Sequence, residues 1–442
     1  MKEKKINRAI STDYVLKPYH ILRYETSEPA NLVLKNGQAE IFGRELCIGQ
    51  EMILGAFDRG TLNTFHGCTV TVLGDNVIAF VMAMNEDQNL PIIVLNIHAN
   101  LEKRRHLANE NQTRGPNVMI CGLDSVGKST LALNLINYAA RKSHRPIFVD
   151  LNSSLNQISV PSTISAISVT KPCEMKDKFC CEEEPLVYCL GQLEPTDNLE
   201  LYHKMVQQLS EMINIRAEND AKILSSGCII NTPGFKKDPS LPVNSQPGIE
   251  LLKNSIQAFE VETVIVIEDV FLFQFLKKDL PNDVNIIRIP KSSAVVTRTQ
   301  QQLNTGRDSS IAAYYHGETK RNRIYPHHLT ISSVDFEIYR LGVDKISDSL
   351  LPHGSNKEEE EAEPQWRKVT KVPFGKDLKN HVLAVSQAQE AALIPDSPVH
   401  GFIVVIDVNT EKNKFTILSP NKELPPNHLL LLTPIMYVDI DN

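Results

Sequence analysis

Residues 122–129 of the chain read GLDSVGKS and match the phosphate-loop pattern G-x-x-x-x-G-K-[ST] at every fixed position. The apolar run at 117–121 predicts a buried strand before the loop. The segment at 131–136 lacks Gly and Pro and predicts a helix after it. This order aims backbone N–H groups and the positive end of a helix at one point. It constrains the fold more than any other feature, because it calls for a P-loop domain that binds a nucleoside triphosphate.

The phosphates are expected to contact the loop and the first turn of the helix. Lys128 would place a positive charge on the β and γ phosphates, and the Ser129 hydroxyl would be a ligand for Mg²⁺. The predicted nucleotide contacts in this stretch are Gly122, Ser125, Val126, Gly127, Lys128, Ser129 and Thr130.

The chain has 442 residues, which predicts two or three domains. Short apolar runs between residues 14 and 99, separated by turns such as Asn36-Gly37, predict a small β domain. From residue 117 to about 317 strands alternate with helices, which predicts a mostly parallel sheet covered on both faces. We therefore expect an α/β protein with an N-terminal β-sandwich-like domain (1–100), a central P-loop NTPase domain (101–320) and a C-terminal β-rich domain (321–442).

Hydrophobic spacing also predicts individual elements of the central and C-terminal regions. The predicted helices are 101–111, 201–215, 251–259, 270–278 and 381–393. The predicted strands are 146–151, 227–231, 263–267, 285–289, 334–339, 402–406, 414–418 and 429–432.

Composition narrows the compartment and the partners. No apolar run approaches the roughly 20 residues that span a bilayer, so we expect no membrane association. The charged start of the chain lacks the apolar core of a signal peptide. Eight cysteines show neither a C-x-x-C pair nor zinc spacing, which favours free thiols in a reducing compartment. The net charge of −7 means that any contact with nucleic acid requires a local basic surface.

Phosphate transfer needs a group that activates the attacking oxygen and cations that neutralise the transferring phosphoryl. Asp150, at the end of the second predicted strand, could act as a base or reach Mg²⁺ through water; equally, it could bond neighbouring backbone. Asn152 cannot accept a proton, and the third strand ends in Asn231 where an Asp is typical. Arg298 and Arg307 lie where small kinases place a lid, although both could be ordinary surface arginines.

Several further stretches occur in the order found in one known family. They are Gly37–Gly43, Phe65–Cys68, Arg114–Pro116, Val126–Thr130, Leu186–Tyr188, Ser226–Thr232, Tyr325–His327 and Gly401–Val405. The chain thereby resembles the polynucleotide 5′-hydroxyl kinase family, and within it most closely the kinase-fold subunit of the pre-mRNA cleavage and polyadenylation machinery. The resemblance implies ATP and Mg²⁺ as cofactors, RNA and other subunits of that machinery as partners, and a nuclear location. It also implies work in mRNA 3′-end processing or tRNA splicing.

The chain departs from the family pattern at positions that matter. Asn152 stands at the family's catalytic Asp position, and Leu303 replaces a lid arginine. Arg59 stands in place of an adenine-contacting Lys, and Phe235 in place of a base-stacking Trp. These changes favour an ATP-binding subunit with weak or absent phosphotransfer. The alternatives are an active RNA 5′-hydroxyl kinase that uses Asp150, and a scaffold that binds no nucleotide.

Overall fold

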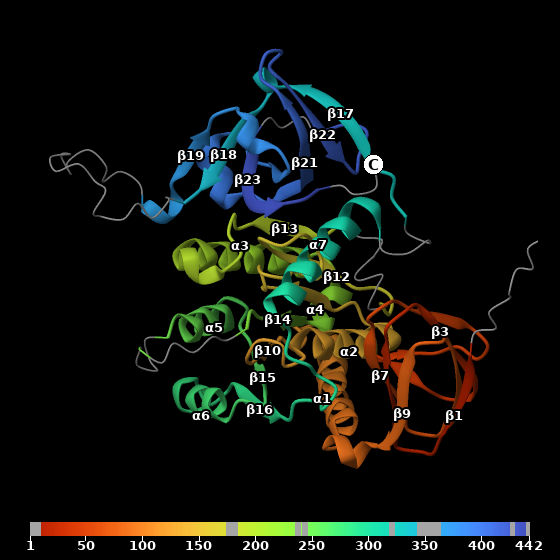
Figure 1. The fold of residues 1–442 in the computed structure, drawn as a ribbon. Helices are drawn as coiled ribbons and strands as arrows, with labels where there is room; N and C mark the ends of the chain where they lie inside the picture. The colour runs from red at the N-terminus through yellow and green to blue at the C-terminus, as the bar shows by residue number, and fades with distance from the viewer. Residues whose placement is uncertain are drawn as a thin grey trace, which may run out of the picture.

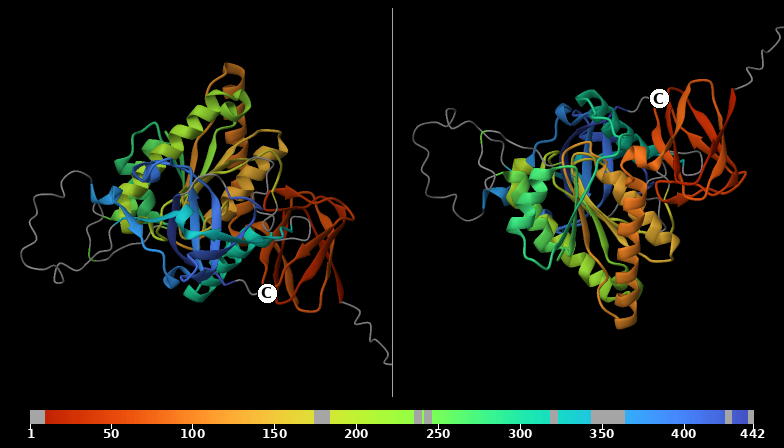
Figure 2. Two further views of the ribbon diagram at one scale, coloured as in Figure 1. Left: turned by 90° about the horizontal axis from the view of Figure 1, so that it is seen from above. Right: turned by 90° about the horizontal axis from the view of Figure 1, so that it is seen from below.

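The structure is a computed structural model that describes residues 10–173, 184–234, 240, 246–317, 323–342, 364–424 and 429–438. Three regions follow one another along the chain (Figure 1). The N-terminal β region packs against one side of a central α/β region, and the C-terminal β region lies on another side of it. The two further views in Figure 2 show the N-terminal region beside the central one from above and from below.

The N-terminal region is a β-sandwich, as predicted. One sheet has the strand order β1-β8-β3-β6, and the other has the order β5-β4-β7-β2-β9. Leu22, Leu32, Leu62 and Val70 are fully buried between the sheets, because apolar side chains alternate along the strands. The strands are β1 (Ser11–Leu16), β2 (His20–Thr26), β3 (Ala30–Gly37), β4 (Glu40–Ile41), β5 (Arg44–Glu45), β6 (Glu51–Leu54), β7 (Arg59–Thr64), β8 (Cys68–Leu73) and β9 (Val77–Ala83).

The central region is a seven-stranded sheet in the order β13-β12-β11-β14-β10-β15-β16. The pairs β11–β14, β14–β10, β10–β15 and β15–β16 are parallel, whereas β12 runs antiparallel to β11 and β13. The strands are β10 (Val118–Cys121), β11 (Ile147–Asp150), β12 (Thr163–Ser168), β13 (Leu186–Cys189), β14 (Cys228–Asn231), β15 (Thr263–Ile267) and β16 (Asn285–Ile289).

Alternating residues of this sheet belong to two different cores. Val118 and Ile120 pack with the helices α1 (Leu90–Asn111) and α2 (Lys128–Arg141) and with the N-terminal sandwich. Met119 and Cys121 face the opposite core. The elements of that second core include β20 (His381–Ser386) and β21 (Val399–Asn409) of the C-terminal region and the helices α3 (Leu199–Glu218), α5 (Pro247–Ala258), α6 (Val270–Asp279) and α7 (Gln300–His316). Helices thus cover both faces, as the alternation of elements predicted; the short α4 (Ala221–Ser226) precedes β14.

The C-terminal region is a seven-stranded sheet in the order β17-β22-β21-β20-β23-β18-β19. Its strands are β17 (His327–Ser332), β18 (Glu337–Leu341), β19 (Val369–Val372), β20 (His381–Ser386), β21 (Val399–Asn409), β22 (Lys414–Ser419) and β23 (Leu429–Met436). The predicted strand at 334–339 starts later, since a short 3₁₀ turn occupies Ser333–Asp335.

The helix predicted at 381–393 is wrong. This stretch forms β20 and the beginning of a 3₁₀ turn, Ala391–Asp396. Val382 and Ala384 face the core shared with the central region, while Leu383 and Val385 face the core of the C-terminal sheet. A strand that is buried on both faces has no polar positions to reveal its period, and pairing with β21 and β23 overrides the helix propensity of Leu and Ala.

The helix predicted at 101–111 is the second half of α1, which begins at Leu90 with Pro91 in its first turn. Six cysteines fall within the described residues, and all of them are free thiols. None of the helices in the described ranges combines the length and the apolar character needed to cross a bilayer.

Candidate nucleotide-binding site

The loop between β10 and α2 has the backbone shape of a phosphate cradle. Gly122, Ser125 and Gly127 have φ angles of 149°, 54° and 99°. Positive φ angles of this kind turn successive N–H groups toward the inside of the loop, where an anion can accept from them. Gly127 immediately precedes α2, so the positive end of that helix is aimed at the same place. A side chain at Gly127 would be strained, and its Cβ would lie 3.3 Å from Val295 Cγ2.

Lys128 is folded back onto this loop. Its ammonium group donates to the carbonyl oxygens of Leu123 at 2.7 Å and Gly122 at 3.3 Å. Burial lowers the pKa of Lys128 to about 8, although the nearby Asp124, Cys121 and Asp150 oppose that shift. A buried ammonium whose acceptors are two neutral carbonyl oxygens can bind an anionic acceptor more strongly.

Ser129 is linked to Asp150 through the side chain of Asn231, at the end of β14. Asn231 Nδ2 lies 3.2 Å from Ser129 Oγ and donates to Asp150 Oδ1 at 3.0 Å. Asn231 Oδ1 is buried and accepts no hydrogen bond from any residue that the structure describes. Because β14 lies between β10 and β11, these three oxygen-bearing side chains form a row along the carboxyl edge of the sheet.

Asp150 is completely buried, and both of its carboxylate oxygens are occupied. Oδ1 accepts from the backbone N–H of Asn152 at 3.0 Å as well as from Asn231, and Oδ2 accepts from the N–H of Gln157 at 2.7 Å. Burial raises the pKa of Asp150 to about 6, against the opposing effect of these hydrogen bonds and of Lys128. The carboxylate therefore closes the turn at 151–157. The strand β11 ends at Asp150, so the alternation expected between Asp150 and Asn152 does not continue to Asn152.

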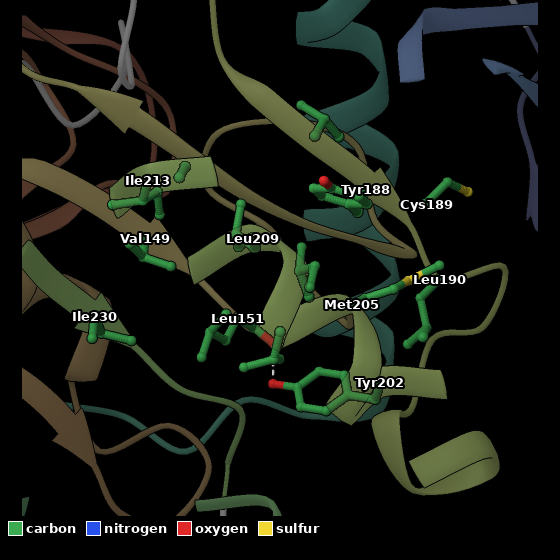
Figure 3. Close-up of a cluster of buried hydrophobic side chains, with 14 of the residues drawn as sticks. Val149, Leu151, Tyr188, Cys189, Leu190, Tyr202, Met205, Leu209, Ile213 and Ile230 are labelled. Atoms are coloured by element: carbon green, nitrogen blue, oxygen red, sulfur yellow. Dashed lines mark hydrogen bonds between the residues drawn. The ribbon is translucent and has the colours of Figure 1, made fainter. Parts of the chain in front are cut away.

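The core that contains Tyr202 and Leu151 fixes the start of this turn. Figure 3 shows Tyr202 of α3 among apolar side chains, pointing toward Leu151, the residue after β11. The Tyr202 hydroxyl donates to the Leu151 carbonyl oxygen at 3.1 Å. Burial raises the pKa of Tyr202 far above its ordinary value, so this donor stays protonated.

The two predicted lid arginines have different environments. Arg307 of α7 donates to the Ser154 carbonyl oxygen at 3.0 Å and to the Ser154 hydroxyl at 2.5 Å, so it holds the turn at 151–157. Arg298 is exposed, and its backbone N–H lies 3.5 Å from Ser125 Oγ in the phosphate loop. Leu303, which lies between these two arginines in the sequence, is half-buried.

The helix α7 is also attached to the C-terminal region. The Tyr314 hydroxyl accepts from the Phe402 N–H at 3.0 Å, and the two rings pack edge to face. Tyr315 is fully buried and stacks on Tyr437. The same helix thus contacts the turn after β11 and the C-terminal sheet.

The N-terminal sandwich reaches the site through the segment after β16. Arg23 donates to the Ser293 hydroxyl at 3.1 Å and also to its carbonyl oxygen. Asp87 accepts from the Ser293 N–H at 2.8 Å and from the Ser292 hydroxyl at 3.0 Å. Two residues further on, Val295 Cγ2 lies 3.3 Å from the place where a Cβ on Gly127 would be, so this segment runs beside the phosphate loop. The sandwich therefore positions one wall of the site.

Of the residues predicted from the sequence, the structure brings together the loop residues, Asp150 and Arg307, and it adds Asn231, Ser154, Arg23 and Asp87. Arg59 forms an exposed cross-strand ion pair with Glu25 of β2, so its predicted contact with adenine stays a prediction. Phe235, the predicted base-stacking residue, lies outside the described residues. Asn231 ends a predicted strand and could have been found from the sequence. The contact from Arg23 to Ser293 joins residues 270 positions apart, and no local pattern announces it.

A mostly parallel sheet with a phosphate loop after β10, one of its inner strands, and a buried lysine at the start of the next helix defines a P-loop nucleotide-binding protein, here flanked by two β regions. The chain belongs to the Clp1 family. Three family models cover most of it: "N-terminal beta-sandwich domain of polyadenylation factor" at 15–108, "mRNA cleavage and polyadenylation factor CLP1 P-loop" at 122–317, and "Pre-mRNA cleavage complex II protein Clp1" at 324–439.

Similar proteins extend over nearly the whole chain. The polyribonucleotide 5′-hydroxyl-kinase Clp1 of Gallus gallus is 35% identical over 94% of this chain and 93% of its own length. That of Homo sapiens is 34% identical over 97% of each chain. A solved structure of a Clp1p–Pcf11p complex has the same fold, with a TM-score of 0.79 at 20% identity, and the match covers 98% of this chain and 99% of the other.

Proposed function

We propose that this chain is an ATP-binding subunit of the nuclear machinery that cleaves and polyadenylates pre-mRNA, with weak or absent phosphotransfer. The observation that carries the proposal is the contrast between a phosphate loop whose positive φ angles form an anion cradle and Asp150, whose buried carboxylate already accepts three hydrogen bonds.

The loop fits ATP with Mg²⁺. Its positive φ angles form an anion cradle, and Lys128 can exchange two carbonyl oxygens for phosphate oxygens. Ser129 Oγ and Asn231 Oδ1, which accepts no hydrogen bond from the described residues, offer neutral oxygens, and Asp150 adds a carboxylate behind Asn231. Such an ion would neutralise charge on the β and γ phosphates. We propose Lys128 and Ser129 as the main contacts of the chain.

The region after β11 supports the weak activity. Asn152, at the position of the family's catalytic Asp, carries an amide and cannot take a proton from an RNA hydroxyl. Asp150 already accepts hydrogen bonds from Asn152, Gln157 and Asn231, so an RNA hydroxyl would have to reach the remaining acceptor site of its buried carboxylate. A positioned general base contributes typically about 10²–10⁴-fold to a rate, so its loss leaves little turnover. Bound ATP would then act as a ligand that stabilises the folded protein.

The partner proposal comes from similar proteins. Family models name a pre-mRNA cleavage complex and a polyadenylation factor, and two solved structures contain Clp1p together with Pcf11p. We propose that the chain binds a Pcf11-like subunit and RNA. The second of those structures addresses loss of ATP in a point mutant of Clp1p, which supports ATP as the nucleotide.

The direct experiment incubates the purified protein with labelled ATP, Mg²⁺ and RNA that carries a 5′-hydroxyl. We expect ATP to bind and raise the melting temperature, while wild-type protein labels RNA weakly or not at all. Strong labelling that disappears in Lys128→Ala would overturn the proposal. Absence of any ATP-dependent rise in melting temperature would favour a scaffold that binds no nucleotide.

An active RNA 5′-hydroxyl kinase is the second candidate, because burial places the pKa of Asp150 at about 6, within reach of a general base, and because the curated relatives are named as kinases. The variants Asp150→Asn and Asn152→Asp separate the two proposals. If Asp150 is the base, Asp150→Asn abolishes labelling while ATP still binds. If the first proposal holds, Asn152→Asp raises labelling above wild type.

A further inference from the structure

A cluster of metal-ligating side chains lies at the opposite end of α2 from the phosphate loop. Glu102 and His106 are one turn apart on α1, and His144 follows the end of α2. Their ligand atoms all lie within 4.8 Å of one another. His144 Nε2 is 2.9 Å from Glu102 Oε1, and His106 Nε2 is 3.3 Å from the same oxygen. Two imidazole nitrogens thus converge on one carboxylate oxygen.

The backbone holds these side chains in place. Glu102 and His106 share a face of a 22-residue helix. His144 lies in a tight turn in which Ser143 has a φ of 64° and the His144 N–H donates to the Ala139 carbonyl oxygen at 3.1 Å. The helices α1 and α2 pack against each other, on the face of the sheet that the N-terminal sandwich shares (Figure 1). The cluster therefore joins two elements that are already fixed.

Exposure differs along the cluster in the manner of an open metal site. The side chains of Glu102 and His144 are 15% and 13% exposed, whereas His106 is 66% exposed. A fourth ligand such as water could enter beside His106. Two imidazoles, one carboxylate and an open position form a ligand set that Zn²⁺ uses. In a tetrahedral zinc site the ligand atoms are about 3.4 Å apart, given metal–ligand distances of about 2.0–2.1 Å. The two distances to Glu102 Oε1, 2.9 Å and 3.3 Å, are close to that value. The distance between the two histidine ligand atoms is at most 4.8 Å, so side-chain movement of about 1 Å would bring it to that value as well.

We propose that Glu102, His106 and His144 form a site for a divalent transition metal of the zinc class. Nothing in the proposed nucleotide function requires this site, since α2 carries it about 20 Å from the phosphate loop at about 1.5 Å per residue. The ligands are also of a different kind, because imidazole suits zinc while ATP-bound Mg²⁺ prefers oxygen.

The neighbouring Arg105 defines how the carboxylate would bind. Its guanidinium is fully buried, donates through Nε to the Ser226 carbonyl oxygen at 3.0 Å, and lies 3.9 Å from Glu102 Oε2. Oε2 is buried and accepts no hydrogen bond within the described part of the chain. Arg105 therefore faces one oxygen while the imidazoles face the other, which favours a single carboxylate–metal bond. Its positive charge also weakens the attraction for a cation, so the affinity is lower than that of a site without it.

The competing interpretation is a plain hydrogen-bonded group of one glutamate and two histidines, and spectroscopy separates the two. Full-length protein is stripped of metal, reduced, and titrated with Co²⁺ as a probe for Zn²⁺. We expect one equivalent to give the visible bands of tetrahedral Co²⁺ without the near-ultraviolet band of thiolate coordination, and Zn²⁺ to displace it. His144→Ala and Glu102→Gln should weaken binding at least about tenfold. His66→Ala, which removes an exposed histidine of the sandwich, should leave it unchanged.

His106→Ala is the variant least able to disturb folding, because this side chain is mostly exposed. In wild type, Zn²⁺ should raise the melting temperature, and in His106→Ala that rise should be lost while the melting temperature without metal stays the same. The proposal would be overturned if wild type did not bind the metal. It would also be overturned if His106→Ala and His144→Ala bound the metal as strongly as wild type does. A thiolate band that persists in all variants would overturn it too, since the metal would then sit on cysteine.

Discussion

The two strand ends that form the site differ in what holds them. After β10 the chain uses backbone geometry, with three residues of positive φ and a lysine whose ammonium donates, within the described residues, to the loop's own carbonyl oxygens. After β11 it uses side chains, and Asp150, Tyr202 and Arg307 all bond into the turn at 151–157 or its first residue. The first end is ready to exchange its contacts for those of a ligand. The second has its polar groups committed to one another.

The proposed function, in which the fold keeps nucleotide affinity while phosphotransfer is weak, follows from this difference. Phosphate binding draws on backbone N–H groups, which every residue except proline supplies, together with Lys128, so it survives substitution at the other loop positions whose φ angles are kept. Catalysis depends on particular side chains at particular places, and the proposal of weak phosphotransfer rests on Asp150, a carboxylate that is already bonded into a turn. The following predictions test that division.

The largest effect is expected from Lys128→Ala at the phosphate loop. Removing charge-assisted hydrogen bonds to phosphate costs about 3 kcal/mol, which corresponds to about 100-fold weaker ATP binding by isothermal titration calorimetry. Lys412→Ala removes an exposed lysine of the C-terminal region and should leave the affinity unchanged. Equal affinity in wild type and Lys128→Ala would mean that ATP does not bind at the phosphate loop.

Gly127→Ala tests whether the backbone shape itself carries affinity. The substitution places a Cβ at a φ of 99° and 3.3 Å from Val295 Cγ2. We expect about 1–2 kcal/mol lower stability in urea unfolding and about tenfold weaker ATP binding. Gly49→Ala is the matched control, since Gly49 has a φ of 77° and nothing within 4 Å of its Cβ position. It should lose comparable stability with no change in affinity; a similar loss of affinity would refute the role of the loop shape.

The charge of Lys128 predicts a pH dependence. Its pKa in the free protein is about 8, and bound phosphates raise the pKa because they favour the charged ammonium. Affinity is therefore full below pH 8 and falls as pH rises through that value, by about tenfold between pH 7 and pH 9. Calorimetry across this range measures it, and Lys128→Ala should show no such fall. A flat profile in wild type would mean that Lys128 does not contact the phosphates.

The smallest effect concerns the turn after β11. Tyr202→Phe removes the donor to the Leu151 carbonyl oxygen and leaves that buried acceptor unpaired, which should lower the free energy of unfolding by about 1 kcal/mol. Tyr188→Phe is a control in the same core, because its hydroxyl makes no hydrogen bond in the described residues. ATP affinity should not change in either variant. If Tyr202→Phe weakened ATP binding as much as Gly127→Ala does, the two strand ends would not be separable.

Much of the fold could be predicted from local patterns. The phosphate loop with its strand and helix, the parallel strands that carry Asp150 and Asn231, and the helix α3 all have periods or motifs that a short window reveals. The helix prediction fails at β20 because burial on both faces removes the period of its sequence. In the site, the bonds from Arg23 to Ser293 and from Arg307 to Ser154 depend on tertiary packing of distant segments, so residue types alone did not indicate them.

The attachment of α7 at two places has a mechanical consequence. Between Arg307, which grips Ser154, and Tyr314, which holds Phe402, runs a rigid helical rod about 10 Å long. Because a helix of this length is stiff, a displacement of β21 in the C-terminal sheet would also displace the turn after β11. A partner that binds the C-terminal region would thereby act, through α7, on the turn at 151–157 beside the proposed nucleotide site.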